Sequence, residues 1–271
     1  MKSKNNILSL LMAGGFLFMI LQTGCSTVVK KPSIPTTKAV EKPVPLPPIE
    51  AVEKQVSLTP IESGVNLSEI TDSNQTPDFK DDYGRIELLY AINNSREYLK
   101  KVESYPGSFK SIGFTPEKQI ETLNLFRDGY VSSKSPQELN KFIAENFRVF
   151  QAIGKENGGA VQFAGYGFAV SSDDVKRKWD HTVYKGSIGF PVTSMRGIAT
   201  GEGFFPLGGL AFAVVETGGE ATKSFFVLGH DVKGDIKTSA RADVFFGIGK
   251  DALKKAEDFN TFGKLYYLLK Q

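Results

Sequence analysis

The sequence predicts a mainly β fold with helices on its N-terminal side. Between residues 78 and 150, apolar residues recur at helical spacing, whereas after Phe150 they gather in short runs rich in β-branched and aromatic residues. Only one short helix, near 251–258, interrupts these runs. Many short strands with Gly and Pro between them favour a closed barrel over a layered α/β sheet.

Residues 1–24 have the pattern of an export signal. Two lysines precede an apolar run over 7–21, which is shorter than a membrane-spanning helix and is followed by Gln-Thr-Gly-Cys. This segment resembles a bacterial lipobox, in which Cys25 is diacylated and becomes the N-terminus. Gln22 departs from the usual Leu, and an ordinary secretory signal peptide is the alternative.

A lipid on Cys25 would anchor the protein in a membrane. Ser26 follows the cysteine, where an Asp would be the usual signal for retention in the inner membrane. We therefore expect an outer-membrane lipoprotein that faces the periplasm and contacts the membrane through its lipid.

Residues 25–77 are expected to form a disordered, Pro-rich tether. The segment is poor in aromatic residues, so it cannot bury enough apolar surface to offset the entropy of ordering. Residues 39–50 (AVEKPVPLPPIE) and 51–62 (AVEKQVSLTPIE) repeat one another, which we interpret as a lengthened spacer. The folded domain is expected over 78–271.

Composition excludes several classes of function. The net charge is +3 with acidic and basic residues interleaved, so no strip of Lys and Arg indicates nucleic-acid binding. Two histidines and one cysteine leave no pattern for a zinc site or a disulfide framework. The glycine-rich stretches 201–203 and 247–250 match no nucleotide-binding motif and are interpreted as turns. No metal or cofactor is expected.

Three helices are predicted ahead of the strands. The first carries an apolar stripe from Ile86 to Leu99, the second opens at Thr115-Pro116, and the third opens at Ser135-Pro136 with a capping box. Strands are predicted over 160–170, 181–188, 211–216, 224–228, 242–246 and 263–269.

Two carboxylates in the stretch 226–250 are candidates for chemistry. Asp231 and Asp243 stand beside strand-like segments, among glycines that let a backbone turn sharply or lie close to a ligand. The alternative is that each aspartate caps or begins a turn. His181 and His230 have no nucleophile elbow near any serine, so a structural or surface role is expected for both.

The order of the segments resembles the membrane-bound lytic murein transglycosylase A (MltA) family. Its catalytic part is a double-psi β-barrel with a three-aspartate (3D) domain at the C-terminal end. The segments that carry the resemblance are 91–101, 147–168, 188–208, 231–237, 243–249 and 259–263.

The sequence also departs from the family. Members insert a second β-domain that forms one wall of the glycan groove, whereas here Tyr184 leads directly into Gly186. Gly201 stands where the first of the three aspartates is expected, with Glu202 beside it, and Asp235 replaces a small residue.

The resemblance implies a lytic transglycosylase that cleaves the MurNAc–GlcNAc bond of peptidoglycan and forms 1,6-anhydroMurNAc. Because the C6 hydroxyl of the sugar is the nucleophile, one carboxyl serves as acid and then as base, and the resemblance gives this role to Asp243. Apolar neighbours at 244–246 would keep that carboxyl protonated by desolvation.

The residues expected to bind the glycan strand are Asp231, Tyr166, Gly165, Lys237 and Gly247. Tyr166 is expected to stack on a sugar face, although a core aromatic at this position is the alternative. The second functional class that fits the chain is a non-catalytic peptidoglycan-binding or scaffold lipoprotein that retains the barrel.

Overall fold

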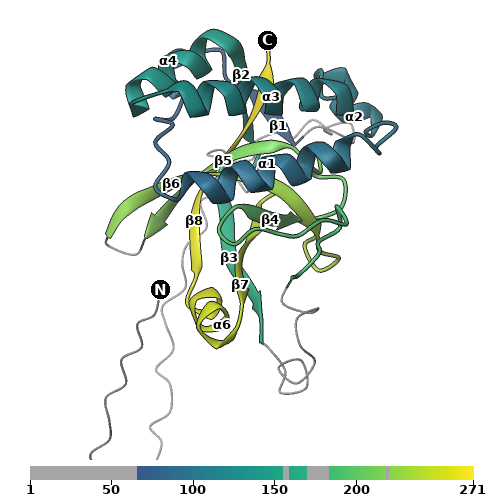
Figure 1. The fold of residues 1–271 in the computed structure, drawn as a ribbon, viewed down its shortest axis with the longest axis vertical. Helices are drawn as coiled ribbons and strands as arrows, with labels where there is room; N and C mark the ends of the chain where they lie inside the picture. Colours follow the sequence, from purple (N-terminus) through teal and green to yellow (C-terminus); the bar gives the residue numbers. More distant parts are fainter. Residues whose placement is uncertain (1–65, 155–158, 170–182, 218–219) are drawn as a thin grey trace, which may run out of the picture. The chain divides into compact units, whose positions relative to one another are not determined.

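The computed structural model describes residues 66–154, 159–169, 183–217 and 220–271 (Figure 1). By its internal contacts the chain divides into two units, 1–56 and 57–271, and all described residues lie in the second. The predicted export signal, Cys25 and the repeats of the tether lie outside the described residues.

Six strands close into a ring. Each strand pairs with the next, and the last pairs back with the first. In order around the ring, the strands are β8 (Asn260–Lys270), β3 (Val161–Phe168), β7 (Arg241–Ile248), β4 (Gly197–Thr200), β6 (Glu220–Val232) and β5 (Leu210–Thr217). The pairs β3–β7 and β4–β6 are parallel, and the other pairs are antiparallel.

Two further strands extend the sheet beyond the ring. β2 (Phe147–Ala152) pairs with β8, and β1 (Leu67–Glu69) pairs with β2, followed by the 3-10 turn η1 (Ser73–Gln75). The prediction that the tether extends to residue 77 is therefore wrong. A single apolar residue, Leu67, is buried in the core, and the polar composition around it hid this strand.

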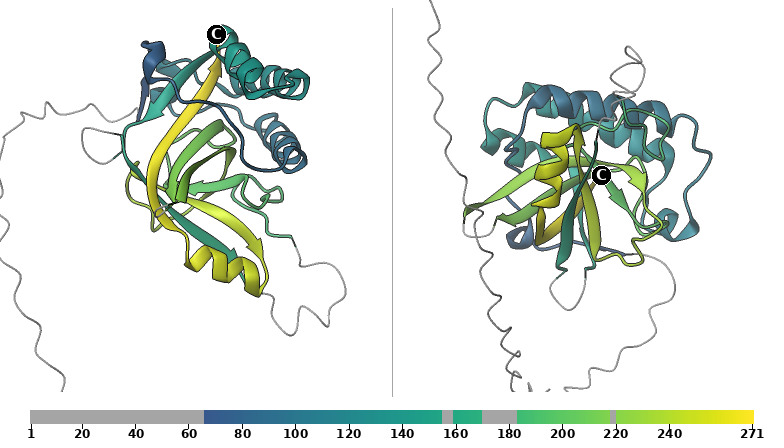
Figure 2. Two further views of the ribbon diagram at one scale, coloured as in Figure 1. Left: turned by 90° about the vertical axis from the view of Figure 1, so that its left-hand side faces the viewer. Right: turned by 90° about the horizontal axis from the view of Figure 1, so that it is seen from below.

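Four helices cover one side of the ring, and a fifth described helix lies at the opposite end (Figures 1 and 2). The four are α1 (Arg85–Leu99), α2 (Gly107–Ser111), α3 (Pro116–Ser132) and α4 (Pro136–Asn146), and the fifth is α6 (Lys250–Glu257). The side chains of Thr115 and Ser135 accept hydrogen bonds from the backbone N–H groups of Lys118 and Glu138, which confirms both predicted helix starts.

Apolar side chains fill two layers, because successive residues of a strand point to opposite faces. On β5, Ala211 and Ala213 face the inside of the ring, where Val227, Val244 and Leu265 join them. Phe212 of the same strand belongs instead to the layer between ring and helices, together with Leu88, Ile92, Leu123, Phe126 and Phe226. The mainly β fold with N-terminal helices is thus confirmed.

Two predicted elements differ from the structure. The strand expected at 181–188 is not found in its described part, where Lys185 makes only an isolated bridge to Pro191. Gly186 and Gly189 favour the irregular path that this segment follows. The neighbouring strand β4 and most of β2 were not predicted, because β4 has only four residues and β2 continues directly from α4.

A buried ion pair joins the segment before α1 to the ring. The Arg196 side chain has no exposed surface, and its Nη1 atom lies 2.8 Å from Oδ1 of Asp81. Arg196 also donates to the backbone carbonyls of Phe226 and Gly84. The hydroxyl of Tyr130 donates to the second carboxylate oxygen of Asp81 at 2.6 Å. Residues 79–84 are therefore fixed against β6.

Candidate active site

The strand register brings Asp231 and Asp243 to the same level of the ring. Asp243 on β7 lies opposite Ala199 on β4, and Ala199 lies opposite Asp231 on β6. Residues paired in this way point to the same face, so the two aspartates lie on either side of Ala199. The distance between them is two strand spacings, about 10 Å. Ala164 on β3 lies on the other side of Asp243. Since Val244 points into the ring, this row lies on the outer face.

Asp243 is held by two cations. Its Oδ1 atom lies 2.8 Å from Nε of Arg241, and its Oδ2 atom lies 3.1 Å from Nη2 of Arg241 and 2.8 Å from Nζ of Lys233. The hydrogen bond to Asp243 raises the pKa of the Arg241 guanidinium. The expected apolar surroundings are therefore found only in part, since Phe245 shares the outer face of β7 with Asp243 but two cations hold the carboxyl. Asp243 is only 1% exposed, but its carboxyl contacts the two cations, while Val244 points away from it.

Asp231 is held by neutral donors instead. Oδ1 accepts from the backbone N–H of Ser187 at 3.0 Å, the hydroxyl of Ser187 at 2.7 Å and the N–H of Val232 at 2.9 Å. Oδ2 accepts from the hydroxyl of Tyr184 at 2.5 Å. Burial, with this hydrogen bond, raises the pKa of Tyr184 well above its ordinary value. Asp231 thus fixes the segment 184–187 to β6.

Tyr166 lies between the two aspartates and is mostly buried. Its ring packs against Phe245, and Nζ of Lys233 lies 3.8 Å from the centroid of the same ring. The hydroxyl makes no hydrogen bond within standard distance, and burial together with the nearby Asp231 charge raises the pKa of Tyr166. The ring is 8% exposed, so its surface is occupied by protein. Phe168, which packs on Tyr184, is the more exposed aromatic of this cluster.

The other predicted site residues are two glycines at packing or turn positions and one exposed lysine. A side chain at Gly165 would meet the carbonyl oxygen of Ala256 at 2.4 Å, so this glycine allows α6 to pack closely on β3. Gly247 has a φ of +112° at the irregular end of β7, beside Ser194. Lys237 is exposed in the turn before Arg241.

The position of the expected first aspartate has no room for a side chain. A Cβ atom on Gly201 would lie 2.3 Å from the carbonyl oxygen of Ile236 and 2.4 Å from the ring of Phe204. The adjacent Glu202 is exposed. The described site therefore has two buried carboxylates where the family pattern has three.

Sequence reasoning missed the two cations. Arg241 precedes Asp243 by two residues on one strand, and the alternation of side chains would have placed both on one face. Lys233 follows β6 in a turn, and no pattern in the sequence indicates that its side chain reaches Asp243. The signal for Arg241 was present, whereas the contact of Lys233 depends on the tertiary fold.

His230 takes a structural position. It is fully buried, and its Nε2 atom lies 2.9 Å from the hydroxyl oxygen of Ser95 on α1. Burial lowers the pKa of His230 to about 4, so the side chain is neutral near pH 7. Within the described residues, no group of three or more His, Cys, Asp or Glu side chains is arranged to hold a metal ion.

Known proteins share part of this sequence and its fold. Residues 196–269 match the family model of the 3D domain. Escherichia coli MltA with bound chitohexaose is similar, with a TM-score of 0.54 and 12% identity over 75% of this chain and 94% of that chain. LtgG, a lytic transglycosylase of Burkholderia pseudomallei, has a TM-score of 0.53 and 12% identity, over 77% and 96% of the two chains.

A membrane-bound lytic murein transglycosylase from Agrobacterium tumefaciens is equally similar. Its TM-score is 0.53 and its identity 12%, over 76% of this chain and 98% of that chain. No curated protein matches the sequence.

Residues 196–269 therefore match the 3D domain, and they supply most of a closed, six-stranded ring. More specifically, the chain has the fold of the MltA lytic transglycosylases, which confirms the resemblance predicted from the sequence. The 28 residues between the end of β3 at Phe168 and the start of β4 at Gly197 are too few for the second β-domain expected of that family. In the described ranges, no helix combines the length and apolar character required to cross a bilayer.

Proposed function

We propose that the protein is a peptidoglycan lytic transglycosylase that cleaves the MurNAc–GlcNAc bond and forms 1,6-anhydroMurNAc. The observation that carries this proposal is the position of Asp243, which lies in the 3D domain, on the outer face of the ring and level with Asp231. The similar E. coli MltA has bound chitohexaose, which supports a glycan strand as the ligand.

One carboxyl carries both proton transfers of the proposed reaction. Neutral Asp243 gives its proton to the glycosidic oxygen while the bond from that oxygen to C1 breaks. The resulting carboxylate takes the proton of the C6 hydroxyl, whose oxygen forms the new bond to C1. No water is added, in contrast to glycosidases that use two carboxylates.

The cations around Asp243 set a condition on this mechanism. Because both carboxylate oxygens of Asp243 accept hydrogen bonds from these cations, at least one of the contacts must open before the carboxyl can reach the glycosidic oxygen. We propose that Lys233 moves first, because it donates one hydrogen bond to Asp243 through a flexible stem whereas Arg241 donates two; this movement also takes its ammonium away from the Tyr166 ring.

The predicted glycan-binding residues divide by exposure. We propose that Lys237 contacts the glycan directly, because it is exposed next to Arg241. Asp231, Tyr166 and Gly165 support the site from beneath: Asp231 fixes the segment 184–187, Tyr166 packs under Lys233, and Gly165 seats α6. Gly247 forms the end of β7.

Digestion of murein sacculi with the purified full chain tests the proposal. We expect mass spectrometry to detect 1,6-anhydromuropeptides, and Asp243→Asn to abolish them because the proton donor and acceptor is lost. Asp251→Asn, a matched change at an exposed carboxylate on α6, is expected to leave the yield unchanged. Sacculi that bind the protein without yielding any anhydro product would overturn the enzymatic proposal.

A second candidate is a non-catalytic peptidoglycan-binding or scaffold lipoprotein. Two observations favour it: Asp243 is buried beneath two cations, and Gly201 has no room for a third carboxylate. For this function, wild-type protein and Asp243→Asn would bind sacculi equally and neither would release product.

We further propose that the ring is a double-psi β-barrel and that a lipid on Cys25 holds it at the outer membrane, facing the periplasm. The two parallel pairs β3–β7 and β4–β6, joined by the antiparallel pair β4–β7, support that topology. Metabolic labelling with a radioactive fatty acid tests the anchor, because Cys25→Ser would abolish the label.

A further inference from the structure

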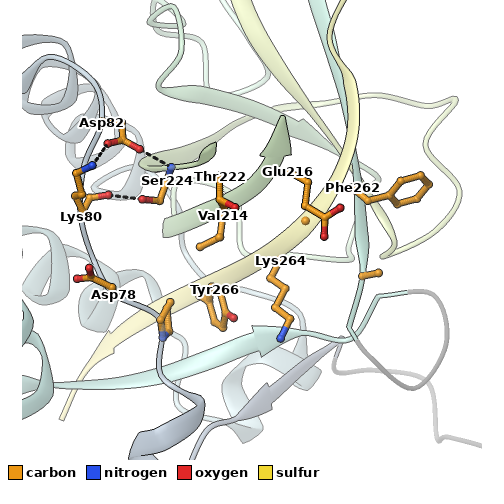
Figure 3. A pocket seen from close by; sticks show the side chains of 13 residues that line it. Asp78, Lys80, Asp82, Val214, Glu216, Thr222, Ser224, Phe262, Lys264 and Tyr266 are labelled. Carbon is orange, nitrogen blue, oxygen red and sulfur yellow. Dashed lines mark hydrogen bonds and ion pairs between the residues drawn. The ribbon is translucent and has the colours of Figure 1, made fainter. Parts of the chain in front are cut away.

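Part of the outer face of the ring is left uncovered by the helices. A cleft of about 610 Å³ lies there, with a floor formed by β5, β6 and β8 (Figure 3). Val214, Lys264 and Tyr266 contribute to this floor, and the segment 77–82 forms one wall. The cleft lies on the same side of the sheet as Phe212, where the helical layer ends.

A second hollow of about 510 Å³ continues the cleft. It shares Ala160 and Phe262 with the first and is lined on its far side by the turn 235–240 and Arg241. The two hollows therefore meet at Phe262. The second hollow ends at Arg241, whose guanidinium holds Asp243.

The strand register measures the path from this groove to Asp243. Phe262 lies opposite Gln162, and Gln162 lies opposite Arg241, so the three form one row across β8, β3 and β7. Asp243 is two residues along β7, which puts it about 12 Å from Phe262, and Tyr266 lies roughly 13 Å further along β8. The path from Tyr266 over Phe262 to Asp243 is thus about 25 Å long.

The lining of the groove fits a sugar polymer. Phe262 is 58% exposed and offers a flat apolar surface at the centre of the groove, on which the C–H face of a pyranose can pack. The carboxylates of Asp78 and Glu216 and the ammonium of Lys264 lie along the same cleft, with Asp78 at the far end from Phe262, and can exchange hydrogen bonds with sugar hydroxyls. A groove with both charge signs and a central aromatic ring suits an uncharged or weakly charged chain of hydroxylated rings.

The wall of the groove is fixed before any ligand binds. Asp82 accepts from the backbone N–H of Ser224 at 2.9 Å and forms an ion pair with Lys80, while the hydroxyl of Ser224 donates to the carbonyl of Lys80 (Figure 3). The buried pair of Asp81 with Arg196 holds the same segment from beneath. A preformed wall lowers the entropic cost of binding a long ligand.

We propose that this groove, from Tyr266 over Phe262 to Arg241, binds the glycan strand of peptidoglycan and directs it towards Asp243. The segment 77–82 then supplies a wall that compensates for the missing second β-domain. The choice of glycan rests on the proposed function, whereas the path of the groove follows from the register and the exposed side chains.

Calorimetric titration with chitohexaose tests this proposal, with the full chain carrying Asp243→Asn so that binding is measured without cleavage. We expect Phe262→Ala to weaken binding about ten-fold, because the central aromatic surface is lost. Tyr90→Ala removes an aromatic side chain of similar exposure (51%) on α1 and is expected to leave the affinity unchanged. Chitobiose is expected to bind more weakly than chitohexaose, because it fills only part of the groove.

Each outcome decides one point. Equal affinity of Phe262→Ala and its parent, or equal affinity for the two oligosaccharides, would overturn the proposal that the groove binds glycan, even if sacculi are cleaved. Binding to whole sacculi that depends on Phe262, without binding of chitohexaose, would assign the groove to the peptide part of peptidoglycan and overturn the glycan. A Phe262 effect on chitohexaose in a chain that yields no anhydro product would uphold the groove and overturn only the catalytic proposal.

Discussion

Asp231 and Asp243 each lie one strand away from Ala199, yet their carboxylates contact different kinds of group. Asp231 accepts hydrogen bonds only from neutral groups, the backbone and hydroxyl of Ser187, the backbone of Val232 and the hydroxyl of Tyr184. Asp243 contacts the side chains of two cations. The first arrangement fixes a segment of backbone, whereas the second consists of side chains that can move.

This difference in contacts indicates which of the two carboxylates stabilises the fold. If Asp231 is removed, the hydroxyl of Tyr184 and the backbone N–H of Ser187 lose their shared acceptor, whereas the N–H of Val232 retains the hydroxyl oxygen of Ser187. If Asp243 is removed, Arg241 and Lys233 can turn towards water, because their side chains are 36% and 24% exposed. Asp231 is therefore expected to serve stability, which leaves Asp243 free for chemistry.

The largest expected effect concerns a third carboxylate. Gly201→Asp is expected to destabilise the protein by about 4 kcal/mol, because the new side chain overlaps the carbonyl of Ile236 and buries a charge beside it. Urea unfolding measures this loss. Gly234→Asp is the matched control, since nothing lies near its Cβ position. A stable Gly201→Asp variant would show that the ring accommodates three carboxylates.

The next prediction compares how much each of the two aspartates contributes to stability. Asp231→Ala is expected to lower the free energy of unfolding by about 3 kcal/mol, whereas Asp243→Ala lowers it by only about 1 kcal/mol. Urea unfolding of both variants checks the difference, with Asp235→Ala as an exposed control in the same turn. Equal losses would contradict the division into a structural and a chemical carboxylate.

Acid is expected to weaken the Asp231 side of the ring through its neighbour His230. Its pKa is about 4 in the folded protein, below the ordinary value of 6.5, so the unfolded chain binds the proton first as the pH falls. Stability is therefore lost from pH 6.5 downwards, by about 2 kcal/mol between pH 7 and pH 5.

Urea unfolding at pH 7, 6 and 5 measures this dependence. His230→Gln is expected to flatten it, while His181→Gln, a change at the other histidine of the chain, is expected to retain it. The same slope in His230→Gln and in wild type would assign the pH dependence to other groups.

The smallest effect distinguishes the two cations. Lys233→Met is expected to change the free energy of unfolding by about 0.5 kcal/mol, because Asp243 keeps both contacts with Arg241. Arg241→Met is expected to cost about 1 kcal/mol, since two hydrogen bonds are lost. Unfolding curves of the two variants provide the comparison, and a larger loss for Lys233→Met would show that Lys233 is the principal partner.

Much of the fold was predictable, because its signals are local. The caps at Thr115 and Ser135 and the change from helical to alternating spacing near Phe150 place the helices and most strands. β1 and β4 were not predictable, since three or four residues carry no periodic pattern. They form because longer strands offer them partners, β2 for β1 and both β6 and β7 for β4.

The candidate site was predictable in position but not in chemistry. The sequence indicates Asp231 and Asp243 as candidates, and the strand register of the structure puts them on one face. The contact of Lys233 with Asp243 and the packing of α6 on Gly165 depend on segments brought together by the fold. Local patterns therefore located the carboxylates without revealing which groups hold them.

The strand β8 has a consequence for the speed of folding. It pairs with β2, β3 and β5, and its partner residues are far apart along the chain, as for Val149 and Leu268, 119 positions apart. The ring cannot close until β8 has been synthesised, and contacts of such long range form slowly. Until then the edges of β3 and β5 that β8 will cover remain unpaired, and unpaired strand edges can pair with other chains.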